Sequence, residues 1–117
     1  MADRVCHLVT KIFRSDHDSN NDGELIAENC FIVIDEFNVL TIHSFEDTKN
    51  NLWQPQLHFC LNDSDEISFK KIRSANGNHV MGRIVLKGRF GLVREKITLK
   101  MDLEEFDRVF NESKSWP

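Results

Sequence analysis

The sequence predicts a mainly β domain in which seven antiparallel strands form a small barrel or sandwich, capped by one C-terminal helix at about residues 102–113. Three observations lead to this prediction. Short runs rich in β-branched and aromatic residues recur along the chain, separated by turn-forming segments. The run 82–101 alternates apolar and basic residues, as paired strands do, whereas the apolar residues after position 102 follow helical spacing. Short strands followed by one amphipathic helix are typical of a small antiparallel barrel or sandwich.

The composition is that of an ordinary globular domain. The chain has 117 residues, of which 40% are hydrophobic and 29% charged. No apolar stretch approaches the roughly 18 residues that a membrane span needs, and the N-terminus lacks the pattern of a secretion signal. We therefore expect a single intracellular domain over residues 1–117, cytoplasmic or nuclear, with no membrane partner. It is either a whole protein or the N-terminal domain of a longer one.

The first half of the chain contains the less regular strands. Residues 4–13 fit either a helical or a strand face, and their Val, Ile, Thr and Phe content favours a strand. The runs 30–35 and 38–45 flank a short turn at Glu36-Phe37. After a polar connection, residues 57–61 and 67–73 predict two further strands.

The stretch 82–101 predicts a hairpin with Gly91-Leu92 as its loop. In this register the apolar residues of the two strands face one another: Phe90 and Val93, Leu86 and Ile97, Ile84 and Leu99. The opposite side carries three pairs of like charges: Arg89 and Arg94, Lys87 and Lys96, Arg83 and Lys100. Because like charges in opposed positions cost stability, this side is a candidate docking surface for an acidic partner.

The C-terminal segment has the signals of a helix start. Asp102 is a plausible N-cap, and Glu105 stands three residues later, where a capping-box acid belongs. Leu103, Phe106 and Phe110 follow helical spacing, with Val109 beside them. We therefore expect the helix to pack one apolar stripe on the sheet.

The charges are segregated along the chain. Residues 1–66 have a balance of −9, residues 67–101 of +8, and the last sixteen residues of −3. Such segregation bears on partners or on intramolecular docking rather than on the fold. Two interpretations stay open: a basic surface that attracts a partner, or acidic loops of the same chain that lie beside the basic strands.

Two patterns suggest a metal site, and neither is complete. Asp18–Gly23 matches the opening D-x-N-x-D-G of a calcium loop, but its twelfth position is Asn29 instead of glutamate, and no helix pattern follows. The three cysteines, Cys6, Cys30 and Cys60, have no CxxC spacing, and the nearby histidines provide no close ligand pair. We expect an acidic loop over residues 14–24, three reduced and buried thiols, and no metal or cofactor.

The order of these elements resembles the pleckstrin-homology-like (PH-like) superfold, which has seven strands and a closing helix, over residues 4–113. In its phosphoinositide-binding members the first loop is basic. Here the corresponding loop is acidic, with Asp16, Asp18, Asp22 and Glu24. The resemblance therefore implies peptide or protein binding in a groove between the helix and a sheet edge, bounded here by residues 103–110.

We expect an interaction module rather than an enzyme, because no G-x-S-x-G, HExxH, Walker-type or G-x-G-x-x-G motif is present. An acidic peptide would suit the basic face, and a helical segment would suit the groove beside the helix. The basic face comprises Lys70, Lys71, Arg83, Lys87, Arg89, Arg94, Lys96 and Lys100. The groove would use Phe106 and Phe110, and Trp53 is either an exposed anchor or a lid on the core.

Two further classes of function remain as alternatives. Nucleic-acid binding would use the basic residues 70–100, although this face lacks the interleaved aromatic residues that stack bases. Homodimeric assembly would use an exposed strand edge or the helix.

Overall fold

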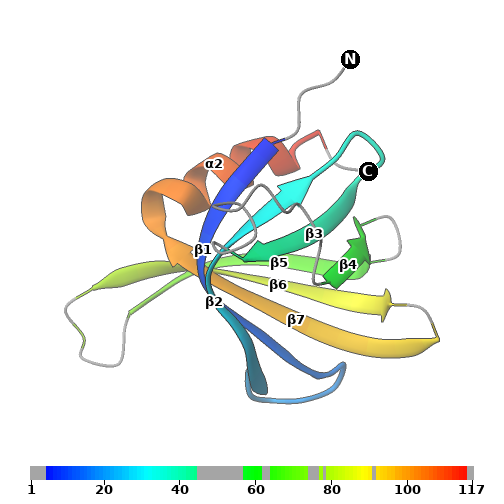
Figure 1. Cartoon of the computed structure of the whole chain (residues 1–117). Helices are drawn as coiled ribbons and strands as arrows, with labels where there is room; N and C mark the ends of the chain where they lie inside the picture. Colours follow the sequence, from blue (N-terminus) through cyan, green and yellow to red (C-terminus); the bar gives the residue numbers. More distant parts are fainter. Residues whose placement is uncertain are drawn as a thin grey trace.

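A computed structural model describes residues 5–44, 57–61, 64–73, 77, 79–90 and 92–115 (Figure 1). Within this part of the chain, strands are followed by one helix, so the predicted mainly β fold with a C-terminal helix is confirmed. The elements are β1 (Val5–Asp16), β2 (Glu24–Ile34), β3 (Val39–Ser44), β4 (Leu57–Cys60), β5 (Ser64–Arg73), β6 (Val80–Phe90), β7 (Val93–Asp102) and α2 (Leu103–Ser113).

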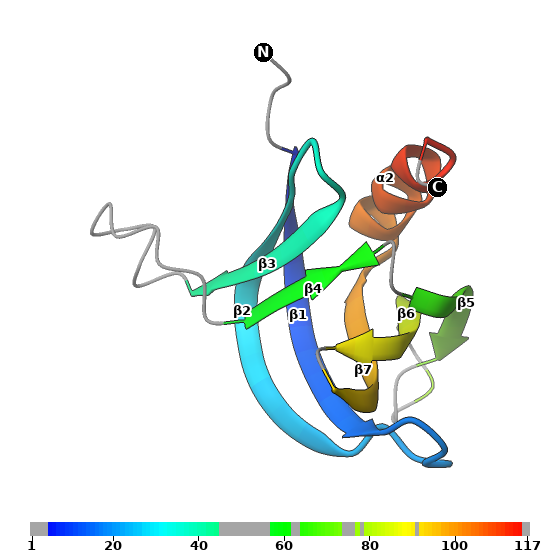
Figure 2. The same ribbon diagram turned by 90° about the vertical axis from the view of Figure 1, so that its right-hand side faces the viewer.

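The described strands form one sheet in the order β4-β3-β2-β1-β7-β6-β5, and neighbouring strands are antiparallel. The pairing of β1 with β7 joins the two ends of the chain, because Lys11–Asp16 lie beside Glu95–Lys100. In Figure 2, β3 and β4 lie on one side of the molecule, β5 and β6 on the other, and α2 across one end. The strands β4 and β5 stand at the two ends of the order.

The β6–β7 hairpin has the predicted register. Leu86 is opposite Ile97 and Ile84 is opposite Leu99, and all four side chains are buried. The like-charged pairs are also opposed as predicted, with Lys87 beside Lys96. A shift by one residue would have placed basic side chains in the core, so the alternation itself selects this register.

The first two strands are longer than the sequence predicted. β1 continues to Asp16, and β2 begins at Glu24 rather than near Cys30, so the connection predicted over residues 14–24 is shorter. Four of the six added residues of β2 are exposed, whereas Ile26 and Ala27 are half-buried and pack against the core. This part of β2 pairs with β1 through Arg14–Glu24 and neighbouring positions. The apolar run is short and is flanked by polar residues, so the sequence analysis did not predict this part of the strand.

The predicted turn at Glu36-Phe37 is confirmed, and its geometry has a clear cause. The Asp35 side-chain oxygen accepts hydrogen bonds from the backbone N–H groups of Phe37 (2.8 Å) and Val39 (3.0 Å). Asn38 takes a left-handed conformation with φ of 60°, which asparagine tolerates better than most residues. These local bonds direct β3 back along β2.

Helix α2 packs on β6, β1 and β7 through its apolar stripe, in which Phe106 and Val109 are buried. The predicted capping box is wrong. Asp102 occupies the N-cap position, but its side chain makes no capping hydrogen bond. The Glu105 carboxylate contacts His7 and Arg108 instead, because the helix is packed against β1 at this point.

The core contains buried aliphatic residues from β1, β2, β3, β6 and β7, together with Leu61 and the two buried helix residues. All three cysteines are free. Cys30 belongs to this core, and burial raises the pKa of its thiol to about 11. The expectation of three buried thiols is wrong for Cys6, which is exposed, and for Cys60, which is half-buried. Cys6 lies one position before the buried His7, and successive strand residues point to opposite faces.

Candidate functional site

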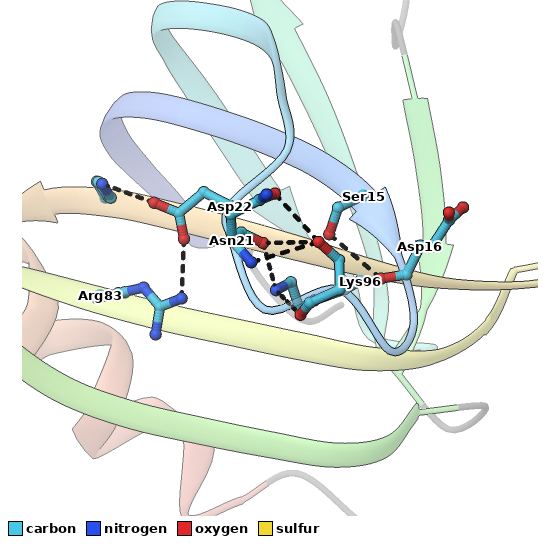
Figure 3. A network of polar contacts seen from close by, with 8 residues as sticks. Ser15, Asp16, Asn21, Asp22, Arg83 and Lys96 are labelled. Carbon is cyan, nitrogen blue, oxygen red and sulfur yellow. Dashed lines mark hydrogen bonds and ion pairs between the residues drawn. The ribbon is translucent and has the colours of Figure 1, made fainter.

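The outer face of the β6–β7 hairpin is covered by the chain's own β1–β2 loop, residues 17–23 (Figure 3). Lys96 is only 4% exposed there. Its Nζ donates hydrogen bonds to the backbone oxygens of Ser19 (2.8 Å) and Asn21 (2.6 Å). Burial, together with the nearby charge of Arg83, lowers the pKa of Lys96. This ammonium group is therefore an internal tether for the loop rather than a free docking group.

Asp22 ties the same loop to two more basic residues. Its carboxylate accepts a hydrogen bond from Arg83 Nη2 at 2.8 Å and lies 2.9 Å from Lys100 Nζ. Partial burial by itself raises the pKa of Asp22, but the hydrogen bonds from Lys100 and Arg83 outweigh it and hold the pKa below its ordinary value. The second interpretation of the charge pattern therefore describes this part of the molecule, because the acidic loop lies on the basic strands of the same chain.

The calcium-like pattern Asp18–Gly23 has a structural role in this arrangement. Gly23 takes a φ of 91°, and a Cβ at this position would overlap the backbone of Arg14. The glycine thus lets the loop fold back, so that its carbonyl oxygens face the Lys96 ammonium group. Among the residues that the structure describes, no cluster of three or more His, Cys, Asp and Glu side chains is arranged to hold a metal ion.

The basic residues at the end of the hairpin lie among acids. Arg89 and Arg94 are exposed, and Lys87 is half-buried. Arg94 Nη2 lies 3.4 Å from His17 Nε2, beside Asp18. The pKa of Asp18 is lowered, first by its hydrogen bond with His17 and also by the charges of Arg94 and Lys87. This end of the molecule is therefore of mixed charge and not a uniformly basic surface.

A groove of about 260 Å³ separates β5 from α2. We call it the helix-side groove, and it is lined by Phe69, Lys70, Lys71, Phe106, Asp107 and Phe110. The Phe69 ring contacts the two helix rings edge to face: its centroid lies 5.9 Å from that of Phe106 and 5.2 Å from that of Phe110. Because Phe110 is 43% exposed, the groove presents an apolar surface to solvent.

Strand register explains how β5 contributes to this groove. Phe69 is opposite Ile84 and Lys71 is opposite Gly82, on the face of β6 that packs inward. Lys70 is opposite Arg83, on the outer face. Both lysines are exposed, and they lie at the rim because β5 is the last strand in the sheet order. Across the groove, Lys114 Nζ lies 5.6 Å above the Phe110 ring.

The structure regroups the predicted site residues. It brings Lys70 and Lys71 together with Phe106 and Phe110, which the sequence analysis had assigned to two different surfaces. The remaining basic residues lie under or beside the β1–β2 loop, and Trp53 lies outside the described residues. Sequence reasoning missed Phe69 as a site residue, although its alternation with Ile67 already indicated an inward-facing position.

No family model, curated protein or solved structure matches the chain. In the described part of the chain, no helix is long and apolar enough to cross a membrane.

Proposed function

We propose that the chain is a non-enzymatic interaction domain of PH-like architecture that receives a short segment of a protein partner in the helix-side groove. The observation that carries this proposal is the aromatic lining between β5 and α2, in which Phe110 is exposed and Phe69 half-buried, with two exposed lysines at its rim. Exposed aromatic groups in a groove are the usual anchoring points of protein interfaces.

The PH-like assignment is supported by the order of the elements. In the described part of the chain, strands precede a closing helix, and the pairing of β1 with β7 brings the first and last strands together. We propose on this basis that the strands close into the predicted barrel or sandwich, with α2 capping it.

The groove suggests the chemistry of its occupant. The three aromatic rings suit one large apolar side chain of the partner. The rim carries Lys70 and Lys71, with Lys114 near Phe110, and the acid among the lining residues is Asp107. We expect a segment with an aromatic or long aliphatic residue next to one or two acids. Among the described residues no strand pairs with β5 on the side away from β6, so an extended segment could also bond to its backbone.

The outer face of the hairpin supports docking less well. Three of its cations, Arg83, Lys96 and Lys100, already contact the β1–β2 loop. A partner would have to displace these internal contacts before binding. No observation favours nucleic acid over a peptide at this face.

Selection of peptides from a displayed random library tests this function. Wild-type protein should enrich peptides that combine a large apolar residue with an adjacent acid. Binding of those peptides should fall about tenfold or more in Phe110→Ser, because anchoring aromatic residues typically dominate such interfaces. The double variant Lys70→Glu/Lys71→Glu should weaken binding through charge reversal at the rim.

The matched control is Lys87→Glu/Arg89→Glu, which makes the same change in charge at the far end of β6. It should leave the affinity of the selected peptides unchanged. Peptides that bind Phe110→Ser but no longer bind this control variant would place the site on the hairpin and overturn the proposal. Failure to enrich any peptide would do the same.

A further inference from the structure

His7 of β1 is buried between two carboxylates of α2. Its side chain is 1% exposed. Nδ1 lies 3.1 Å from Glu105 Oε2, and Nε2 lies 2.6 Å from Glu112 Oε2. The two glutamates are seven residues apart in α2, a spacing that places them on the same side of the helix. One ring thus joins the first strand to both ends of the C-terminal helix.

These contacts impose a requirement for protons. An ionised carboxylate only accepts hydrogen bonds, and a neutral imidazole has only one N–H to donate. Both contacts can therefore be hydrogen bonds only if an additional proton is present in the cluster. The imidazolium form satisfies both carboxylates at once and adds an attractive charge in a site from which water is largely excluded.

The surrounding charges are compatible with an imidazolium ion. Arg108 Nη1 donates to Glu105 Oε1 at 2.9 Å. The positive charges of a His7 imidazolium and of Arg108 therefore balance the negative charges of the two glutamates. On β2 the residue paired with His7 is Ile32, which carries no charge. The neighbouring Cys6 side chain is exposed but partly desolvated, and this desolvation and then the Glu105 charge raise the pKa of its thiol. Asp102 and Glu104 line the adjacent hollow with Glu105 and add negative potential.

We propose that His7, Glu105 and Glu112 form a proton-dependent clasp that holds α2 against β1. Loss of the imidazolium proton leaves one half-buried carboxylate facing a nitrogen lone pair, so the attachment of the helix weakens as the pH rises. At strongly acidic pH the glutamates become neutral and the ionic part of the clasp is lost as well. Docking of the helix is therefore accompanied by proton binding and is tightest between these two limits.

The clasp has a consequence for the helix-side groove, which rests on the function proposed above. Phe106, Asp107 and Phe110 lie on α2 between the two clasped glutamates. Weakening the clasp would let this wall of the groove move relative to β5. The domain would then release a groove-bound peptide as rising pH removes the proton that the two contacts share.

Two NMR measurements on the whole chain test the clasp directly. In ¹⁵N spectra of the imidazole recorded over a range of about pH 5 to 8, both nitrogens of His7 should carry a proton at the acidic end of that range. Amide exchange of α2, corrected for the intrinsic pH dependence and expressed relative to the core strands, should rise about tenfold towards its alkaline end, because a hydrogen bond to a charged group is lost.

The informative variant is Glu112→Gln, whose carboxamide can accept from or donate to a neutral imidazole. It should keep α2 docked while removing most of the pH dependence. Glu28→Gln, the same change at an exposed position of β2 outside this cluster, should behave as the wild type. Equal pH dependence in wild type and Glu112→Gln, or a singly protonated His7 throughout, would overturn the clasp.

Peptide binding serves as a separate readout. If helix exchange follows the pH as described but no peptide binds in the groove, the clasp is supported and only the proposed function is contradicted. Peptides that bind in the groove while helix exchange in the wild type and Glu112→Gln stays the same would support the function and reject the clasp.

Discussion

Lys96 and Asp22 show how individual charges are accommodated at the edge of this core. Burying an ammonium group costs free energy unless hydrogen bonds replace its water. Two backbone oxygens of the β1–β2 loop do so for Lys96, and Arg83 and Lys100 do the same for the Asp22 carboxylate. The fold therefore uses these groups to hold a polar loop in one position.

We predict that Asp22→Asn destabilises the protein by about 1 kcal/mol at neutral pH, the usual size of one net hydrogen bond. Because its pKa is lowered in the folded state, ionised Asp22 stabilises the fold above the ordinary aspartate value of about 3.9, and this contribution is lost as the pH falls through the folded-state pKa. The difference in free energy of unfolding between wild type and variant, measured in urea, should therefore become smaller as the pH is lowered.

The control for this prediction is Asp16→Asn, which removes the same charge from an exposed side chain at the start of the loop. It should change the free energy of unfolding little at any pH. An Asp22→Asn effect of constant size from neutral to acidic pH would show that the ion pairs do not carry the stabilisation.

At the scale of elements, the position of α2 depends on a missing side chain in β6. A Cβ added at Gly82 would overlap the Cβ and ring of Phe106, the buried aromatic residue of the helix. Gly82 is opposite Lys71 in β5, so its lack of a side chain also leaves room at the helix-side groove. One glycine therefore sets how closely the helix approaches the sheet.

We predict that Gly82→Ala destabilises the domain by about 1–3 kcal/mol, as overpacking of a filled site usually does. The backbone of Gly82 has no left-handed strain, so the cost should come from the overlap with Phe106. The free energy of unfolding should be measured in urea for Gly82→Ala, Phe106→Leu and the double variant. The double variant should lose less free energy of unfolding than the two single variants lose together. Additive costs would mean that the two residues do not compete for the same space.

For the whole molecule, part of the segregated charge is complementary within the chain, because Asp22 of the loop pairs with Arg83 and Lys100 of the strands. The acidic first half of the chain supplies the loop, and the basic stretch 67–101 supplies the strands on which that loop lies. Strong charge asymmetry in a sequence is often associated with a polyanionic partner. Here the same asymmetry is used within one domain.

We predict that the wild-type domain has no measurable affinity for a single-stranded oligonucleotide at about 0.15 M salt, since the phosphates would have to replace the loop and would meet its acids. The triple variant Asp16→Asn/Asp18→Asn/Asp22→Asn should bind weakly, and only at low salt. Fluorescence anisotropy measures both. Tight, steeply salt-dependent binding by the wild type would show that the basic strands are accessible after all.

The two candidate surfaces differed in how far the sequence could predict them. The basic side of the hairpin was predicted residue by residue, but its occupation by the β1–β2 loop remained one of two interpretations. The helix-side groove was predicted only as the neighbourhood of residues 103–110. Its other wall, with Phe69 and the two lysines, depends on which strand ends the sheet, and strand order is a property of long-range pairing.

Local patterns were enough to predict the register of the β6–β7 hairpin, the turn after β2 and the extent of the helix, because alternation, turn chemistry and helical spacing act within a few residues. Long-range contacts decide which charged groups bind to other parts of the same chain and which surface stays open to solvent. Lys96 bonds to Asn21 across 75 positions, and His7 reaches Glu112 across 105. Such contacts join residues that share no local pattern, so only the folded chain brings them together.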